Sequence, residues 1–255
     1  MKQVNKRQVA KSFQRGKDTY DANATIQQRI SKNLVDRLTN YPDVSYKNVF
    51  EIGCCTGNLT ELLLKKFAIE KLYLNDLVTD FHQDVVKRVA ALQSVEIIPK
   101  FGDVEQVYFP DKLSLVVSSA TFQWLSDMQA LFKKISQSLV RKGYLAFSIF
   151  GPGTLQEFKE VTGIGLEYKA VGTLLDMLEE DYHIEEEETV KDQLFFSTPR
   201  EVLKHMQATG VGGVKEHRWT RGSLRQFEKD YYEKFGGASG VPVTYMSSLV
   251  IASKK

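Results

Sequence analysis

Apolar residues recur along this chain with two spacings, and stretches of one spacing alternate with stretches of the other. Short apolar runs, which are typical of buried strands, occupy residues 48–53, 71–77, 95–102, 113–120 and 143–150. Apolar residues at helical spacing lie between these runs and predict amphipathic helices around residues 59–67, 81–92 and 128–139. Strands that alternate with helices form a parallel sheet covered on both faces. The pattern therefore predicts an α/β fold with a doubly wound, Rossmann-like sheet.

The pattern differs on either side of this core. Before it, Val9, Phe13, Ile26 and Leu34 recur at near-helical spacing, which predicts two N-terminal helices. After residue 150 come a helix from 154, a loose region to about 181, an extended stretch through 196, helices beginning near 199 and 221, and a last strand over 243–253. We therefore expect one domain with a helical cover inserted before the last strand. Its parts are an N-terminal helical lid (1–45), a core (46–150), covering helices and an insertion (151–240) and the final strand (241–255).

The overall composition argues against several classes of protein. The 255 residues carry a formal net charge of +2, which is too little for bulk binding to nucleic acid. No apolar run approaches the roughly 20 residues needed to cross a bilayer, and the basic start of the chain lacks the apolar region of a secretory signal. The only cysteines, Cys54 and Cys55, are adjacent, so they favour neither an ordinary disulfide nor a zinc site. We therefore expect a cytoplasmic protein that binds no metal.

Candidate chemistry is concentrated where the first strand ends. The strand passes into the next helix through Glu51-Ile52-Gly53-Cys54-Cys55-Thr56-Gly57, with the spacing E-x-G-x-x-x-G. Gly53 and Gly57 permit a sharp bend and the close approach of a ligand to the backbone, and Glu51 places a carboxylate beside the turn. An ordinary strand–turn–helix connection could explain this motif alone. A dinucleotide-binding dehydrogenase, in contrast, would require G-x-G-x-x-G.

Acidic residues also follow the second and third strands. Ligands of doubly wound sheets bind beyond the carboxyl ends of the strands. Asp76 lies at the distance expected for an acceptor of ribose hydroxyl groups, while Asp103 can accept from an adenine amino group with Val104 packed on the ring. A single acid at a strand end is more often a cap or turn residue. Together, Glu51, Asp76 and Asp103 place three acids beside one glycine turn, which favours an adenosyl ligand.

The turn resembles motif I of the class I S-adenosylmethionine (SAM) methyltransferases. Cys55 stands where that family usually has a third glycine, and its side chain narrows the space next to the cofactor. Other segments are similar to the malonyl-[acyl-carrier-protein] O-methyltransferases of biotin synthesis, the BioC family. These segments are 10–13 with 20–21 and Gln27, 118–125, 145–155 (in which FGPGTL, 150–155, is the most specific part) and 240–245. The resemblance implies the class I methyltransferase fold and methyl transfer from SAM to the free carboxylate of a malonyl thioester, leaving S-adenosylhomocysteine (SAH).

The resemblance and the strand-end residues together define a candidate site. The candidate cofactor-binding residues are Tyr20, Gln27, Glu51, Gly53, Cys55, Gly57, Asp76, Leu77, Asp103, Val104 and Ser118. Tyr20 and Gln27 would form the lid over SAM. The candidate catalytic residues at the acceptor are Gln123, Trp124, Arg218, Arg221 and Arg225. One of the arginines would hold the malonyl carboxylate in a bidentate pair, and Trp124 could equally be a core aromatic residue. A carboxylate is already ionised at neutral pH, so no general base is expected.

The charged residues are unevenly distributed. Lys2, Lys6, Arg7, Lys11, Arg15 and Lys17 precede the first acid, Asp18. Such a basic arm would attract an acidic acyl carrier protein, and it would attract a coenzyme A thioester as well. The acidic run over 179–188 is most simply a solvated face. Two other functions stay open: a class I methyltransferase with another small-molecule acceptor, and a non-catalytic protein of this fold that binds SAM.

Overall fold

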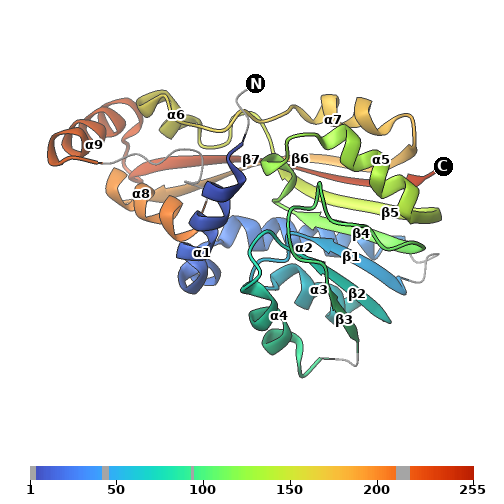
Figure 1. Cartoon of the computed structure of the whole chain (residues 1–255). Helices are drawn as coiled ribbons and strands as arrows, with labels where there is room; N and C mark the ends of the chain where they lie inside the picture. The colour runs from blue at the N-terminus through green and yellow to red at the C-terminus, as the bar shows by residue number, and fades with distance from the viewer. Residues whose placement is uncertain (1–3, 42–45, 93–94, 211–218) are drawn as a thin grey trace. The chain divides into compact units, whose positions relative to one another are not determined.

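The computed structural model describes residues 4–41, 46–92, 95–210 and 219–255 (Figure 1). The chain divides into two compact units, each built from several segments. The larger unit comprises Ile26–Ile149, Lys169–Thr189 and Ser248–Lys255, and the smaller unit comprises Met1–Thr25, Phe150–Tyr168 and Val190–Ser247. The candidate cofactor residues other than Tyr20 all belong to the larger unit.

A seven-stranded sheet confirms the predicted fold class. Its strands lie in the order β3-β2-β1-β4-β5-β7-β6. Their bounds are β1 Asn48–Ile52, β2 Lys71–Asn75, β3 Glu96–Pro99, β4 Leu113–Ser119, β5 Leu139–Phe150, β6 Tyr182–Phe196 and β7 Val241–Lys254. The pairs β1–β2, β1–β4, β2–β3 and β4–β5 are parallel. The strand order reverses between β1 and β4, which is where doubly wound sheets bind their ligands.

Two apolar clusters enclose the sheet of the larger unit. One contains residues of α5 (Met128–Ser138) and α7 (Val171–Leu178), and the other contains residues of α2 (Thr25–Leu38), α3 (Asn58–Lys66) and α4 (Phe81–Val89). On β4, Val116 belongs to the first cluster, while Leu115 and Val117 belong to the second. Successive side chains of a strand point to opposite faces, so the continuous apolar run of β4 is buried on both sides.

The described residues of the smaller unit contain parts of β5, β6 and β7 together with the helices α1 (Lys6–Asn23), α6 (Gln156–Thr162), α8 (Pro199–Ala208) and α9 (Arg221–Phe235). Helix α1 packs closely on the end of α8 at Gly16. A Cβ atom at Gly16 would lie 3.0 Å from the carbonyl oxygen of Ala208, so the absence of a side chain permits this contact. The start of α8 matches its sequence signal, with Thr198 as the N-cap and Pro199 in the first turn. Helix α9 begins at Arg221, as predicted.

The sequence prediction is wrong at two kinds of position. Helix α7 lies inside the region expected to be loose, and its Leu174 and Leu178 are fully buried. Several strands also end earlier than predicted. Gly53 and Ala120 directly follow β1 and β4 with φ angles of 77° and 51°. Such left-handed angles cannot continue a strand.

Candidate active site

The turns that follow β1, β2 and β3 are joined by backbone and side-chain hydrogen bonds. The N–H groups of Gly53 and Cys54 donate to the carbonyl oxygen of Asn75 at 2.8 and 3.0 Å. The buried Asn75 amide in turn donates to the carbonyl oxygen of Gly102 at 3.0 Å, and the Gly102 N–H donates to the carbonyl oxygen of Asp76 at 2.8 Å. The predicted strand-end residues therefore come together at one edge of the sheet. Asn75, which holds them there, is a residue that the sequence analysis missed.

The two glycines of the first turn have a structural reason to be glycine. Gly53 has a φ of 77°, and a Cβ atom there would collide with the Thr121 side chain. Gly57 has a φ of 87°, and a Cβ atom there would lie 3.2 Å from Val85 of α4. Both positions thus combine a left-handed backbone with close packing. Ligand contact at these glycines stays a prediction.

Cys55 adopts the same backbone region without being glycine. Its φ is 46°, a conformation that costs residues with a Cβ atom free energy. Its side chain is half-buried, and its N–H donates to Asp76 Oδ2 at 2.9 Å. The glycine common at this position in class I methyltransferases therefore has a backbone reason, in addition to the steric reason expected from the sequence.

Asp76 connects the first two turns. It is 9 % exposed, and its Oδ1 accepts from the N–H of Val78 at 2.8 Å while Oδ2 accepts from Cys55. Burial raises the pKa of Asp76 to about 6, against the opposing effect of these backbone hydrogen bonds. A carboxylate has about four acceptor positions in total. Asp76 can therefore serve the protein backbone and still accept a hydrogen bond from a ligand.

Three of the candidate site residues each have one buried oxygen atom without a hydrogen-bond partner among the described residues. These atoms are Glu51 Oε1, Gln27 Oε1 and Gln123 Oε1. Glu51 on β1 is fully buried, its other oxygen accepts from Thr60 Oγ1 at 2.7 Å, and burial raises its pKa to about 8. Gln123 uses only its amide nitrogen, which donates to the carbonyl oxygen of Ala120 at 2.6 Å.

The elements that carry these oxygens adjoin one another. Ile52 of β1 pairs with Ser118 of β4. Ser31, one helical turn after Gln27 on α2, donates to Ser119 Oγ at 2.9 Å. Unpaired buried acceptors cost free energy, so this edge suits a ligand rich in N–H and O–H donors. An adenosyl amino acid, with its ammonium, hydroxyl and amino groups, is such a ligand.

The remaining cofactor candidates have local roles in the structure. Ser118 is fully buried and donates to the carbonyl oxygen of Ile52 at 2.9 Å, which supports the β1–β4 pairing. Asp103 Oδ1 accepts from the N–H of Glu105 at 3.1 Å, while Val104 is buried and Leu77 is half-buried. Their contacts with a cofactor stay predictions.

The acceptor candidates are divided between the two units. Gln123 and Trp124, in the short helix η1 (Phe122–Trp124), are buried in the larger unit. Tyr20, Arg221 and Arg225 belong to the smaller unit, where both arginines are exposed on α9. Arg218 lies outside the described residues. The roles of all these side chains toward a substrate stay predictions.

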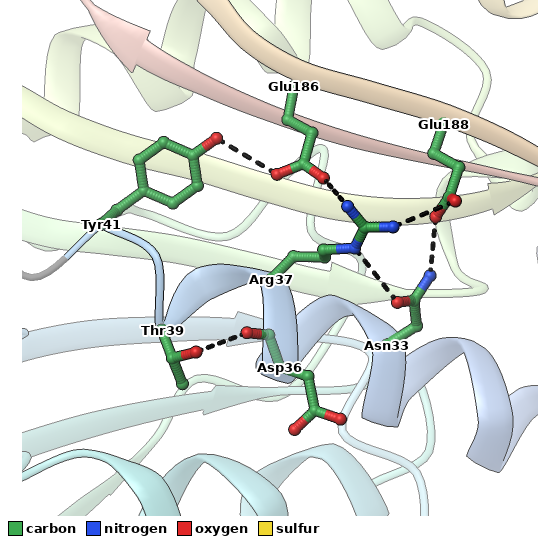
Figure 2. A network of polar contacts seen from close by, with 7 residues as sticks. All are labelled: Asn33, Asp36, Arg37, Thr39, Tyr41, Glu186 and Glu188. Atoms are coloured by element: carbon green, nitrogen blue, oxygen red, sulfur yellow. Dashed lines mark hydrogen bonds and ion pairs between the residues drawn. The ribbon is translucent and has the colours of Figure 1, made fainter.

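Figure 2 shows a network that the sequence analysis did not anticipate. Arg37 on α2 pairs with Glu186 at 2.5 Å and with Glu188 at 3.0 Å, both on β6. Tyr41 donates to Glu186 at 3.2 Å and Asn33 donates to Glu188 at 3.0 Å. The interpretation of this acidic run as a merely solvated face is therefore wrong for Glu186 and Glu188, because they link the edge strand to a helix.

In the described part of the chain, no group of three or more His, Cys, Asp or Glu side chains is placed to hold a metal ion. No helix among the described residues is long and apolar enough to span a membrane.

Comparison with known proteins identifies the family. A family model described as "Methyltransferase domain" matches residues 50–147, the segment from β1 to β5. The malonyl-[acyl-carrier protein] O-methyltransferase of Calditerrivibrio nitroreducens is 35 % identical, covering 92 % of this chain and 91 % of the relative. The enzyme of the same name from Haemophilus ducreyi is 34 % identical, covering 100 % and 99 %. The chain belongs to the malonyl-[acyl-carrier protein] O-methyltransferase family.

Solved structures support the fold of this family member. The N-methyltransferase NodS of Bradyrhizobium japonicum, solved with SAH, superposes with a TM-score of 0.53 at 16 % identity, covering 89 % of this chain and 86 % of NodS. The YcgJ protein of Bacillus subtilis gives a TM-score of 0.60 at 10 % identity, covering 88 % and 98 %. At such identities the likeness establishes the fold alone.

Proposed function

We propose that this methyltransferase transfers a methyl group from SAM to the free carboxylate of malonyl-acyl carrier protein, at the start of pimeloyl and biotin synthesis. The observation that carries this proposal is the end-to-end similarity to malonyl-[acyl-carrier protein] O-methyltransferases. The acceptor oxygens of Glu51, Gln27 and Asp76 at one edge of the sheet independently support SAM as the methyl donor, because SAM carries hydrogen-bond donors.

The residues present fit SAM as the cofactor. Asp76 would hold the ribose hydroxyl groups, Asp103 and Val104 the adenine ring, and Glu51 and Gln27 the amino-acid end. When bound there, SAM supplies a methyl group on a positively charged sulfur, ready for a nucleophile. The unpaired Oε1 atoms of Glu51 and Gln27 support this assignment, since each needs a donor.

The side chains of the protein contribute positioning more than proton transfer. The malonyl carboxylate is ionised at neutral pH and needs no base. Gln123 and Trp124, buried after β4, would exclude water and orient the acceptor. One of Arg218, Arg221 and Arg225 would pair with the carboxylate, aiming one of its oxygens at the methyl group.

Helix α1 would recognise the carrier. Arg7, Lys11 and Arg15 are exposed and lie at intervals of four residues, so they share one face of α1. No acid precedes Asp18 in the chain, so α1 carries only positive charges up to Lys17. An acidic carrier protein would be steered toward such a face. A coenzyme A thioester would also be attracted, so the carrier has to be determined by competition.

Mass spectrometry of reaction mixtures tests the proposed function. The protein with SAM should add one methyl group to malonyl-acyl carrier protein and none to acetyl-acyl carrier protein, which lacks the free carboxylate. Malonyl-coenzyme A at the same concentration should react more slowly. Equal reaction of the acetyl and malonyl carriers, or reaction only with a free small molecule, would overturn the assignment of the acceptor. Failure of SAH to bind at all would overturn the assignment of the cofactor.

A further inference from the structure

The segment Asp103–Phe109, here called the strap, connects β3 with β4. It begins with the two candidate adenine-binding residues. The N–H groups of Gln106 and Val107 donate to the carbonyl oxygen of Asp103 at 2.8 and 2.9 Å, so the strap folds back on its own start. Any shift of the strap would therefore move Asp103 and Val104.

The side chain of Glu105 attaches the strap to the turn before α5. Its Oε1 accepts from the N–H of Asp127 at 2.7 Å, and both of its oxygens lie 3.2 Å from the N–H of Ser126. Asp127 is the N-cap of α5 and accepts from the N–H of Ala130 at 3.0 Å. A carboxylate is favoured at this end of a helix, because the N–H groups there are unpaired and the helix dipole is positive.

A second contact fixes the strap farther along the same helix. Lys134 Nζ donates to the carbonyl oxygens of Val107 at 2.5 Å and Val104 at 3.4 Å, and it lies 4.6 Å from the centre of the Phe109 ring. The Phe109 ring packs edge-on against Phe50 of β1 at 4.8 Å. The strap is thus fastened to α5 at two points, by Glu105 and by Lys134.

The two ends of the Glu105 contact lie next to different parts of the candidate site. Glu105 is two residues after Asp103, on the cofactor side. Ser126 is two residues after Trp124, on the acceptor side. We propose that Glu105 is a positioning residue that couples the binding of the cofactor to the binding of the acceptor. This inference rests on the proposed function. Beyond that function, we infer that the strap and the η1–α5 turn move as one piece.

Coupling of this kind has a measurable signature. If SAH and the malonyl carrier each favour the same arrangement of strap and turn, each raises the affinity of the other by the same factor. Calorimetry can measure this factor without turnover, because SAH carries no methyl group to transfer. The dissociation constant of SAH is measured alone and with saturating malonyl-acyl carrier protein.

The variants Glu105→Ala and Glu105→Gln test the role of the carboxylate. Glu105→Ala removes all contacts with the turn, so the factor should fall from about fivefold or more in the wild type to about one. The KM for malonyl-acyl carrier protein should rise with it. Glu105→Gln retains one acceptor oxygen and should therefore show part of the wild-type coupling factor. If Glu105 had only a structural role, this partial recovery would not be seen. Glu96→Ala, which removes an exposed carboxylate paired with Lys71 in the same unit, should leave the factor unchanged.

Two outcomes would overturn the inference. One is a wild-type protein that methylates malonyl-acyl carrier protein but shows no coupling. The other is Glu105→Ala protein with an unchanged coupling factor. If Glu105→Ala does not fold, the same comparison is made with Glu105→Gln, and a wild-type factor there also overturns it. A wild-type protein that methylates no malonyl carrier would instead refute the proposed function.

Discussion

Replacement of Cys55 by glycine should stabilise the protein slightly and should not weaken cofactor binding. Cys55 has a φ of 46°, and a left-handed conformation costs a residue with a Cβ atom roughly 1–2 kcal/mol. Glycine avoids this cost but loses about 0.5–1 kcal/mol, because it is more flexible in the unfolded chain. The free energy of unfolding of Cys55→Gly should therefore rise by about 0 to 1.5 kcal/mol.

The variant Cys55→Ala is the matched control. It removes the thiol but keeps the Cβ atom and hence the backbone cost, so it separates strain from side-chain chemistry. The N–H of residue 55, which donates to Asp76 at 2.9 Å, is present in all three proteins. Cys55→Gly should then exceed Cys55→Ala in unfolding free energy by about 1 kcal/mol, as expected when glycine occupies a left-handed position.

Urea denaturation under reducing conditions measures the stabilities, and calorimetry measures SAH affinity. We expect the SAH affinity of Cys55→Gly to equal or exceed that of the wild type, because the glycine opens space beside the turn. A loss of affinity in both variants would mean that the thiol contacts the cofactor productively. A Cys55→Gly protein less stable than Cys55→Ala would refute the strain argument itself.

The other predictions concern the acids of the site and the basic helix. Asp76→Ala should weaken SAH binding by about 1–3 kcal/mol in calorimetry, since ligand donors would lose a buried acceptor; unchanged affinity would contradict its role. The pKa of Glu51 is raised from 4.5 to about 8 in the folded protein. Protonated Glu51 therefore contributes its full share to the free energy of unfolding below pH 4.5, and this share is lost as pH rises through 8. Glu51→Gln should therefore reduce the fall in unfolding free energy between these values, and an identical pH profile would count against it. Charge reversal at Arg7 and Lys11 should slow association with the acyl carrier protein and flatten its salt dependence in stopped-flow measurements, with turnover at saturation unchanged; a changed turnover would place them elsewhere in the mechanism.

The core of the fold was predictable because its signals are local. The apolar run of β4 and the helical spacing of α5 are each complete within about ten residues, so periodicity reveals them. Helix α7 was missed because it is short and its sequence starts Val171-Gly172-Thr173, residues that disfavour helices. Ala120 ends β4 by adopting a φ of 51°, and an alanine gives no sign of this in the sequence.

The site was predictable only in part for a related reason. Acids at strand ends can be recognised from the sequence because parallel strands end at the same edge. The side chains that hold those strand ends together cannot, since their partners are distant in sequence. Asn75 reaches Gly102, and Glu105 reaches Asp127, through pairings that exist only once the sheet has formed. The orphaned oxygens of Gln27 and Gln123 likewise become visible only when burial is known.

The acidic stretch of β6 affects whether two copies of the protein can pair through their edge strands. β6 is the terminal strand of the sheet, so one of its sides offers backbone groups to which another molecule could add a strand. Glu185 and Glu187 are exposed there, while Arg37 holds Glu186 and Glu188 against α2 (Figure 2). A second copy of the strand would bring like charges together at every second residue, which is unfavourable. The glutamates of β6 therefore disfavour edge-to-edge pairing of two copies, and we expect their replacement by uncharged residues to lower the solubility of the protein.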